Sequence, residues 1–498
     1  MKKKIVLLMT LLLMMPLVVG AKKLSYSQTG AVGGSTVGSG GVFRDVVVDG
    51  DKYVAVGYRK DTKGLISLIS TFDFIDEKEN SNLAPNPEYS KEYNGSAECI
   101  AFKAIDKKSD GYVVVGNSLD CGNQSPKVAS IVLYDKKINY YKGTSMQNGD
   151  KSILFNDVVA TSDGYIVVGA KQNASKTKAL IVKYNADLTS VTWQKEVDII
   201  DENGFSSVVK TYDGNFVAVG KDQNKKAVIY KFDANGDVIW VKYGNSDFSA
   251  DNFNDITEAS DHSLVAAGSL NDNSVIVKLD ASGNMLWHKE STASEKNNFN
   301  SISVDEKSYF VLKQKHEGTN DNYSTKTLGI FVYDESGNEL YHLDGTKEEY
   351  WNFEKLRIYG GNYVVVAGYN NALEGNTSNP DHAMIYMLYY AGQHTITINN
   401  KTNGSTESKI YYEDDEIILK DLLGEYTEIS ITYVNGNKLE FNDGKFIMPD
   451  CDVVITIITE IKQNPKTGNI VPILLGTCGV VGAVVILNYT KKRNKFLK

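Results

Sequence analysis

The residue types that most often carry chemistry are spread through this 498-residue chain instead of being gathered in one motif. Asp233, Asn235 and Asp237 alternate as they do at the start of a calcium-binding loop, but the glycine and closing glutamate that an EF-hand requires are missing at their offsets. Asp233 also begins an Asp-x-x-Gly segment between two strand-like runs, which is typical of a turn. We therefore expect a turn at this position and no metal site.

Motifs of known catalytic chemistry are also absent from the sequence. The six histidines show neither HExxH nor paired spacing, which argues against a catalytic zinc. No GxSxG sequence and no phosphate-binding loop occurs. Carboxylates recur before glycine at Asp110, Asp163 and Asp213, where turn geometry explains them. We predict no catalytic residue and no cofactor, with an enzyme site in a central channel as the alternative.

The chain has only four cysteines, too few for a disulfide-based scaffold and wrongly spaced for zinc. Cys99 and Cys121 lie on either side of a predicted hairpin that turns near Asp110, so the two would lie almost opposite each other. They are the candidate disulfide of the chain, and a pair of free thiols is the alternative.

Composition sets the broad class. With 42% hydrophobic and 23% charged residues, the chain is long enough for two domains or one large repeat domain. Its net charge of -9 gives no general basic surface, so nucleic acid is not an expected partner.

A strand–turn–strand segment that begins with Phe and usually ends with Gly recurs along most of the chain, roughly every 50 residues. Its copies are Phe43–Gly57, Phe102–Gly116, Phe155–Gly169, Phe205–Gly220, Phe253–Gly268, a divergent copy Phe299–Lys313, and Phe353–Gly368. The β-branched second strand favours burial on both faces, and Asp-Gly tolerates the positive φ of a tight hairpin. We expect the final Gly to allow a turn or close packing at the sheet edge.

A second hairpin follows most copies of the first one, as in Ala227–Gly244, where an Asp-x-x-Gly turn joins two strands. Two hairpins give four strands, which is one propeller blade. The predicted fold class is all-β, with a seven-bladed β-propeller of four-stranded blades at residues 22–392. The seventh copy lacks a fourth strand, and we predict that Lys23 to Gly30 supplies it and closes the ring.

These repeats resemble those of bacterial propellers with pyrroloquinoline-quinone-like or WD-type repeats, in which a Trp-bearing strand ends in a Tyr-Gly step. The strands WQKEV, WVKYG and WHKES carry the resemblance here. It implies an architecture and says little about activity. Residues that the copies share encode the blade, so function is expected where they differ: in 74–96, in 245–252 and in the divergent copy 299–313.

Both ends of the chain have the features of an exported, anchored protein. Residues 1–21 combine three lysines, an apolar run and Gly20-Ala21, which is typical of a cleaved signal peptide, with an uncleaved anchor as the alternative. Residues 470–488 form an apolar segment that we expect to be a transmembrane helix, and the basic tail 489–498 would stay in the cytoplasm.

The pentapeptide Asn464-Pro465-Lys466-Thr467-Gly468 lies in a predicted linker, 463–469, directly before that apolar segment. Pentapeptide, apolar segment and basic tail together resemble a cell-wall sorting signal of Gram-positive bacteria, although Asn464 stands where Leu is usual. The resemblance implies a sortase that cuts between Thr467 and Gly468 and joins Thr467 to peptidoglycan. A plain membrane anchor is the alternative.

Residues 393–462 have a different pattern and predict a small, mainly β module. Its segment Phe446 to Ile457 resembles the end of internalin-type B repeats of Gram-positive surface proteins, which implies a spacer or stalk. We therefore expect a protein of the extracellular face, at the cell wall or membrane, that binds a carbohydrate or protein ligand. An extracellular hydrolase or lyase acting on polysaccharide and a purely structural spacer are the alternatives.

Overall fold

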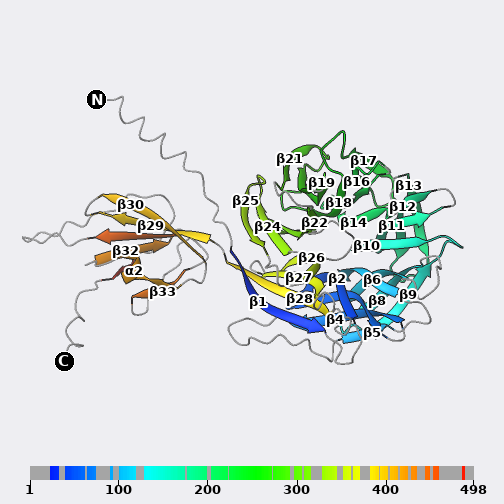
Figure 1. Cartoon of the computed structure of the whole chain (residues 1–498), viewed down its shortest axis with the longest axis horizontal. Coiled ribbons are helices and arrows are strands. Elements are labelled where there is room, and N and C mark those ends of the chain that lie inside the picture. Colours follow the sequence, from blue (N-terminus) through cyan, green and yellow to red (C-terminus); the bar gives the residue numbers. More distant parts are fainter. Residues whose placement is uncertain are drawn as a thin grey trace, which may run out of the picture. The chain divides into compact units, whose positions relative to one another are not determined.

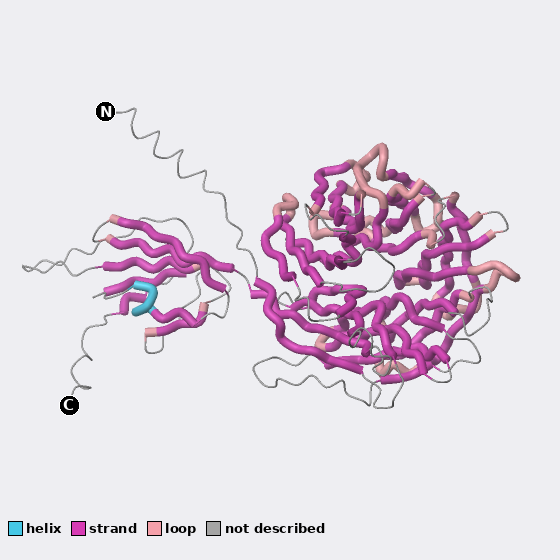
Figure 2. The backbone as a smooth tube through the Cα atoms, in the orientation of Figure 1, coloured by secondary structure: helices cyan, strands magenta, loops and turns pink. Residues whose placement is uncertain are grey.

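The structure, a computed structural model, describes most of the chain between residues 23 and 458 and one short segment beyond. The described ranges are 23–32, 40–61, 64–73, 90–93, 100–118, 128–173, 176–198, 203–222, 224–271, 273–291, 297–305, 308–315, 328–344, 351–359, 363–370, 382–391, 393–401, 404–412, 416–423, 428–433, 444–448, 452–458 and 485–487. Two compact units are present, one of Tyr26–Tyr389 and one of Met1–Ser25 with Tyr390–Lys498. The fold is all-β, and α2 (Leu419–Leu423) is the single helix of these ranges (Figure 2).

Seven four-stranded antiparallel sheets make up the first unit, and we number them 1 to 7 in chain order. Sheets 1 to 3 contain β2 (Gly40–Asp49), β3 (Lys52–Asp61), β4 (Gly64–Asp73) and β5 (Ser90–Tyr93); β6 (Ile100–Lys108), β7 (Gly111–Ser118), β8 (Ala129–Asp135) and β9 (Tyr140–Met146); β10 (Ile153–Thr161), β11 (Gly164–Gln172), β12 (Thr177–Asn185) and β13 (Val191–Val197). Sheets 4 and 5 contain β14 (Phe205–Lys210), β15 (Phe216–Lys221), β16 (Ala227–Phe232) and β17 (Val238–Tyr243); β18 (Asn252–Glu258), β19 (Leu264–Leu270), β20 (Asn273–Leu279) and β21 (Met285–Glu290). Sheets 6 and 7 contain β22 (Asn297–Asp305), β23 (Ser308–Lys315), β24 (Leu328–Asp334) and β25 (Glu339–Asp344); β26 (Trp351–Tyr359), β27 (Tyr363–Asn370), β28 (His382–Ala391) and β1 (Lys23–Val32).

The sheets follow one another around a common centre in chain order (Figure 1). The first strand of each sheet contacts the first strand of the next, from β2 to β6 and onward to β22 and β26, and β26 contacts β2 again. This is the β-propeller arrangement, in which every sheet face is covered by a neighbouring sheet.

The predicted origin of the last strand is confirmed. Sheet 7 has the strand order β1-β28-β27-β26, so the N-terminal segment Lys23–Val32 is hydrogen-bonded to β28, which lies near the end of the repeat region. The first and last strands of the repeat region thus belong to one sheet. This pairing closes the ring, because the ring cannot open between β1 and β28 without breaking their hydrogen bonds.

Burial divides each sheet into an inner and an outer part. In sheet 3, β11 and β12 are buried over nearly their whole length, whereas β13 alternates between exposed and half-buried residues. The β-branched runs of the second strands are therefore buried on both faces, as the sequence predicts.

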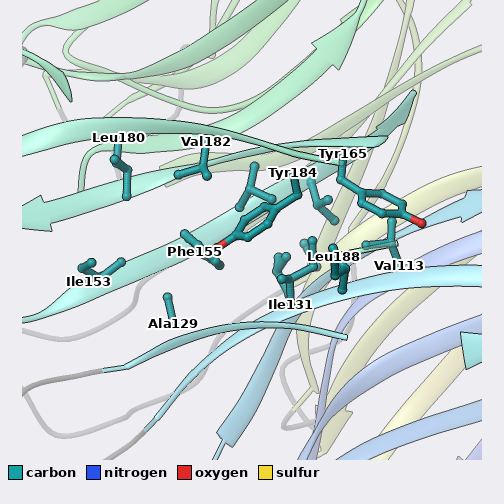
Figure 3. Packing of buried hydrophobic residues seen from close by; sticks show 14 of the residues in the cluster. Val113, Ala129, Ile131, Ile153, Phe155, Tyr165, Leu180, Val182, Tyr184 and Leu188 are labelled. Carbon is teal, nitrogen blue, oxygen red and sulfur yellow. The ribbon is translucent and has the colours of Figure 1, made fainter. Parts of the chain in front are cut away.

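The hydrophobic core is a series of layers between neighbouring sheets. Figure 3 shows one layer, in which Val113, Ala129 and Ile131 of sheet 2 face Phe155 and Leu180 of sheet 3. Further layers join sheets 1 and 2, 3 and 4, 4 and 5, and 5 and 6. Another joins sheet 7 to sheet 1 and so belongs to the closure of the ring.

The repeated Phe and Gly of the copies pair next to a β-bulge. In sheet 5, Phe253 pairs with Gly268 and the register shifts between Phe253 and Asp255. All seven sheets have the same shift two residues after the Phe. A Cβ at Gly268 would lie 1.9 Å from the carbonyl oxygen of Asn252, so only Gly fits there. The Gly thus lies within a strand, which confirms the expected close packing and corrects its placement at a turn or sheet edge.

The Asp-Gly turns differ from one another in their backbone. Gly214 has a φ of 81°, as expected for a turn that needs a left-handed residue. Gly111 does not have a positive φ; a Cβ there would lie 1.9 Å from the carbonyl oxygen of Tyr134. Close approach of two backbones, and not a left-handed conformation, requires the glycine at position 111.

The second unit is a mixed sheet with a short helix. Its sheet has the order β30 (Ser405–Tyr412), β29 (Gln393–Asn400), β34 (Val453–Ile458), β32 (Glu428–Tyr433) and β35 (Val485–Leu487), and β31 (Glu416–Ile418) pairs with β33 (Lys445–Ile447). β29 and β34 are parallel. Phe446, Met448, Val453, Ile455 and Ile457, from the segment Phe446 to Ile457, are buried in its core.

Several predictions fall partly or wholly on residues that the structure does not describe. The signal peptide 1–21, the disulfide candidates Cys99 and Cys121, and the pentapeptide Asn464 to Gly468 lie outside the described residues. Within the predicted transmembrane helix 470–488, only Val485–Leu487 is described, and these three residues form a strand paired with β32. No helix in the described part of the chain is long and apolar enough to cross a membrane.

Candidate functional site

Three carboxylates of the described hairpin turns form ion pairs with buried lysines, whereas Asp110 pairs with Lys108 of the first strand of its sheet. Each buried lysine lies on the third strand of its sheet, is at most 4% exposed and reaches the Asp of the preceding turn. The pairs are Asp163–Lys183 at 2.5 Å, Asp213–Lys231 at 2.7 Å and Asp261–Lys278 at 2.9 Å. The sequence predicts Asp163 and Asp213 as turn residues but does not reveal the lysines, whose partners are known only once the strands are paired.

Two of these lysines also reach the next sheet. Lys231 donates to the carbonyl of Ala281 in sheet 5, and Lys278 donates to the carbonyl of Glu335 in sheet 6. The pairing lowers the pKa of Asp261 to about 2, because the hydrogen bonds from Ser263 and Lys278 outweigh the effect of burial. A carboxylate held in this way stabilises the fold and is a poor candidate for acid–base catalysis.

The Asp233 segment is a turn, as predicted. Asp233 accepts hydrogen bonds from the backbone N–H groups of Asn235 and Asp237 through one carboxylate oxygen, and Gly236 has a φ of 78°. Within the described ranges no group of three or more His, Cys, Asp or Glu residues is arranged to hold a metal ion.

A ring of polar side chains lines the axis of the first unit, directly after the bulges of the first strands. We call it the axial ring; its members are Asp45, Asp106, Asp157, Ser207, Asp255, Ser301, Lys355 and Arg357. Most of its hydrogen bonds connect one sheet to the next. Asp45 accepts from the backbone N–H of Ile105 at 3.0 Å, for example, and Arg357 of sheet 7 reaches Asp45 of sheet 1 at 3.4 Å.

The axial ring holds four carboxylates against two cations. Burial would raise the pKa of Asp255, but Lys355, at 2.8 Å, and Arg357 outweigh it and bring that pKa below its ordinary value. Burial raises the pKa of Asp157 to about 6, which the charge of Lys355 opposes only in part.

The hydroxyl of Ser207 lies between two carboxylates of the axial ring. Its Oγ lies 2.8 Å from Asp157 and 2.9 Å from Asp255. One hydroxyl proton cannot be donated to two carboxylates at once. Ser207 can therefore donate to only one of the two at a time. Below about pH 6, where Asp157 is protonated, Asp157 can donate to Ser207 and leave the Ser207 proton for Asp255. All these groups are used to join sheets, so the axial ring is a structural device.

A cavity of about 660 Å³ lies where the first strands of sheets 4, 5 and 6 end. It is open to solvent over most of its extent. The residues that line it are Lys210, Thr211, Tyr212, Glu258, Ala259, Ser260, His262, Val304 and Asp305. It is the candidate binding site of the described residues.

An exposed aromatic pair dominates the cavity. Tyr212 is 79% exposed, and its ring stacks on that of His262 with the centroids 4.1 Å apart and the planes at 22°. The backbone N–H of Tyr212 donates to Glu258 at 2.7 Å, and the other carboxylate oxygen of Glu258 lies 4.0 Å from the His262 ring nitrogen. These contacts hold in place an aromatic surface that faces water.

Both members of the pair depart from the repeat pattern. Tyr212 occupies the place of Ser162 in sheet 3 and Ser260 in sheet 5. His262 occupies the place of Gly214, with the same turn hydrogen bond and a φ of 62°. A non-glycine residue in this left-handed conformation costs about 1 kcal/mol. Four other non-glycine residues of the described ranges have positive φ: Ile138 and Leu188, which are buried, and Lys225 and Asn271, which are exposed like His262.

Charge in the cavity is mixed. Glu258 and Asp305 supply carboxylates and Lys210 an ammonium group. Burial raises the pKa of Glu258, and the hydrogen bond from Tyr212 opposes this shift only in part.

The three segments in which function was expected have different outcomes. The divergent copy 299–313 contributes Val304 and Asp305 to the cavity. In 245–252, Phe248 and Ala250 are buried against Phe253 in the layer between sheets 4 and 5, which is a structural role. Of the 74–96 insertion, only Ser90–Tyr93 is described, as β5. Tyr212 and His262 were missed, although an alignment of the copies marks both.

No family model and no curated protein matches the chain. Among solved structures, Sqt1 from Chaetomium thermophilum is similar at 9% identity and a TM-score of 0.43, over 75% of this chain and all of that one. The Pan2 WD40 domain of Neurospora crassa is similar at 9% identity and a TM-score of 0.40, over 58% of this chain and 88% of that one. A protein of unknown function from Dyadobacter fermentans has 13% identity and a TM-score of 0.37, over 74% and 99% of the two chains. At these values the neighbours carry no inference about ligand or activity, and the fold is argued from the sheets alone.

Proposed function

We propose that the chain is a ligand-binding protein of the extracellular face, in which a seven-bladed propeller recognises a carbohydrate or protein through the cavity at Tyr212. The observation that supports the proposal is the exposed, fixed pair of Tyr212 and His262, whose residues break the repeat at adjacent sheets. Tyr212 is 79% exposed, so most of its apolar surface would be removed from water only by a bound ligand. Tyrosine is enriched at recognition surfaces.

The ends of the chain support surface display. The signal-like residues 1–21, the pentapeptide at Asn464–Gly468 and the apolar segment 470–488 with its basic tail are arranged as in a sortase substrate. Under this proposal a sortase joins Thr467 to peptidoglycan, and the module at 393–462 is a spacer.

Glu258 gives a specific reason to keep a hydrolase or lyase as the second candidate. Its carboxyl group lies in the cavity beside His262 and has a raised pKa, which is a property of general acids. Its hydrogen bond to the backbone of Tyr212 favours a positioning role instead.

The test of the binding proposal uses the full chain in a detergent without a sugar headgroup, applied to arrays of glycans and extracellular proteins. We expect binding to at least one array member and its loss in Tyr212→Ala. The same samples are incubated with wall polysaccharides, and released sugars are measured. Turnover that is lost in Glu258→Gln, without stable binding, would favour the enzyme instead.

The anchor is tested separately in the host. We expect Thr467→Ala to move the protein from the wall fraction to the membrane fraction, because the pentapeptide would lose the threonine side chain next to the bond that the sortase cuts. Covalent wall attachment of the variant at wild-type level would contradict the proposed anchor.

A further inference from the structure

We propose that the ligand of the Tyr212 cavity is a neutral oligosaccharide, one of whose pyranose rings stacks on the exposed face of Tyr212 while its hydroxyls bond to the charged residues of the cavity rim. This inference rests on the proposed function and narrows its ligand to one chemical class.

The first argument is the shape of the Tyr212 ring surface, which we call the platform. His262 covers one face of the Tyr212 ring, which leaves the opposite face available as a flat apolar surface. The hydrogen bond from the backbone N–H of Tyr212 to Glu258 fixes this residue before a ligand arrives. Binding therefore costs little additional conformational entropy. A pyranose has a complementary face of C–H groups, flat and apolar in the same way.

The second argument is the chemistry around the platform. Lys210 is a donor, and the carboxylates of Glu258 and Asp305 are acceptors. Sugar hydroxyls donate and accept, so a ring that lies on Tyr212 meets groups of both kinds at its edge. Charged partners make the stronger hydrogen bonds of this type.

Charge selects among sugars. The rim has two carboxylates for one ammonium group, and the whole chain has a net charge of -9. Anionic sugars such as uronic acids would meet repulsion from both, whereas a neutral sugar does not.

A peptide is a weaker fit. Apolar side chains anchor in enclosed pockets from which water is excluded. Here the aliphatic lining consists of Ala259 and Val304, while Lys210, Tyr212, Ser260 and His262 are exposed to solvent. The cavity thus offers a wet, flat surface and no deep apolar hole.

The departures from the repeat provide a sharp experiment. Tyr212→Ser and His262→Gly restore the residues that the equivalent positions carry in other sheets, so both variants are compatible with the fold. Tyr243→Ala, in the outer strand of the same sheet and outside the cavity, removes another exposed tyrosine and is the matched control. Each protein is the full chain in a detergent without a sugar headgroup.

The probes are cellohexaose, maltohexaose and chitohexaose, with hexagalacturonic acid as the anionic counterpart, and binding is measured by calorimetry. We expect at least one neutral hexasaccharide to bind, with Kd raised more than ten-fold in Tyr212→Ser and raised in His262→Gly. Tyr243→Ala should bind as wild type, and hexagalacturonic acid should not bind. The melting temperature of His262→Gly should equal or exceed that of wild type, because relief of the left-handed conformation compensates for the lost stack.

The outcomes separate this inference from the function on which it rests. If no neutral hexasaccharide binds, or if Tyr212→Ser binds as wild type, the carbohydrate inference is wrong. Tyr212-dependent binding to a protein array member would then leave the proposed function standing. No binding on either array would contradict both.

Discussion

At the scale of residues, the buried charges hold the sheets together, whereas the aromatic pair of Tyr212 and His262 is exposed. Asp157 shows how a buried charge is managed: it lies beside Ser207, whose single proton cannot satisfy both Asp157 and Asp255. Burial raises the pKa of Asp157 to about 6, so below that pH a protonated Asp157 can donate to Ser207 while Ser207 donates to Asp255.

Replacing Asp157 by Asn should change the pH dependence of stability. The folded pKa of Asp157, about 6, is above the ordinary value of 3.8. Its contribution to stability is therefore fully present below the ordinary pKa and is lost as pH rises through about 6. The free energy of unfolding of Asp157→Asn should rise relative to wild type by up to about 3 kcal/mol between pH 4 and pH 7.5. Urea unfolding at several pH values measures the difference.

Asp213→Asn is the matched control, because the pKa of Asp213 is lowered by its hydrogen bonds to Lys231 and Thr211, which outweigh burial. Its stabilising effect is present above the ordinary pKa and is lost as pH falls, so the variant should lose stability relative to wild type on going from acid to neutral pH. A parallel pH dependence for the two variants would contradict the proton assignment.

At the scale of elements, the repeated unit is organised by the bulge after its Phe. The bulge directs polar residues such as Asp45 and Asp255 toward the axis and requires a glycine on the partner strand. A second recurring contact joins the outer strands: the indole N–H of Trp193 donates to the carbonyl of Ala234 in the next sheet. The ring of that Trp lies where a Cβ on Gly236 would be.

Gly268→Ala should be strongly destabilising, by at least about 2 kcal/mol, because its Cβ would meet the Asn252 carbonyl oxygen and neither backbone is free to move. Gly143→Ala on the outer strand β9 is the control, since its nearest neighbour would be 3.2 Å away, and a change within about 1 kcal/mol is expected. Thermal unfolding of both variants measures the difference. Equal melting temperatures would show that the bulge relaxes more easily than the packing suggests.

At the scale of the whole first unit, stability depends on closing the ring. Core layers between neighbouring sheets include the layer between sheets 7 and 1, and the axial ring connects the same two sheets through Arg357 and Asp45. An open series of sheets would expose one apolar face at each end.

Deleting residues 22–32 should lower the melting temperature by more than about 5 °C, because sheet 7 would lose its fourth strand and leave the edge of β28 unpaired. Calorimetry measures the shift, and size-exclusion chromatography should show association through the free edge. Deleting residues 1–21 alone is the control and should leave the melting temperature unchanged. An unaltered melt after removal of 22–32 would mean that β1 contributes little to closure.

Much of the fold could be predicted because its signals are local. The spacing of Phe, Asp-Gly and β-branched residues predicted the hairpins. The strand-like segment from Lys23, which precedes the first copy, predicted the origin of the last strand. The role of the repeated Gly was predicted only in part, since its opposing residue is set by strand register. The candidate site was missed at Tyr212, although comparison of the copies would have revealed it.

The sequence by itself therefore determined the repeated four-strand unit, because hairpin formation depends on neighbouring residues and their alternation. Tertiary structure alone decided the partners of Lys231, the contact of Ser207 with Asp157 and the stacking of Tyr212 on His262. The reason is physical. These partners come from separate strands or separate copies, about 50 residues apart for the last two pairs. Only the pairing of strands and the packing of one sheet on the next bring such residues within reach of a hydrogen bond or a ring contact.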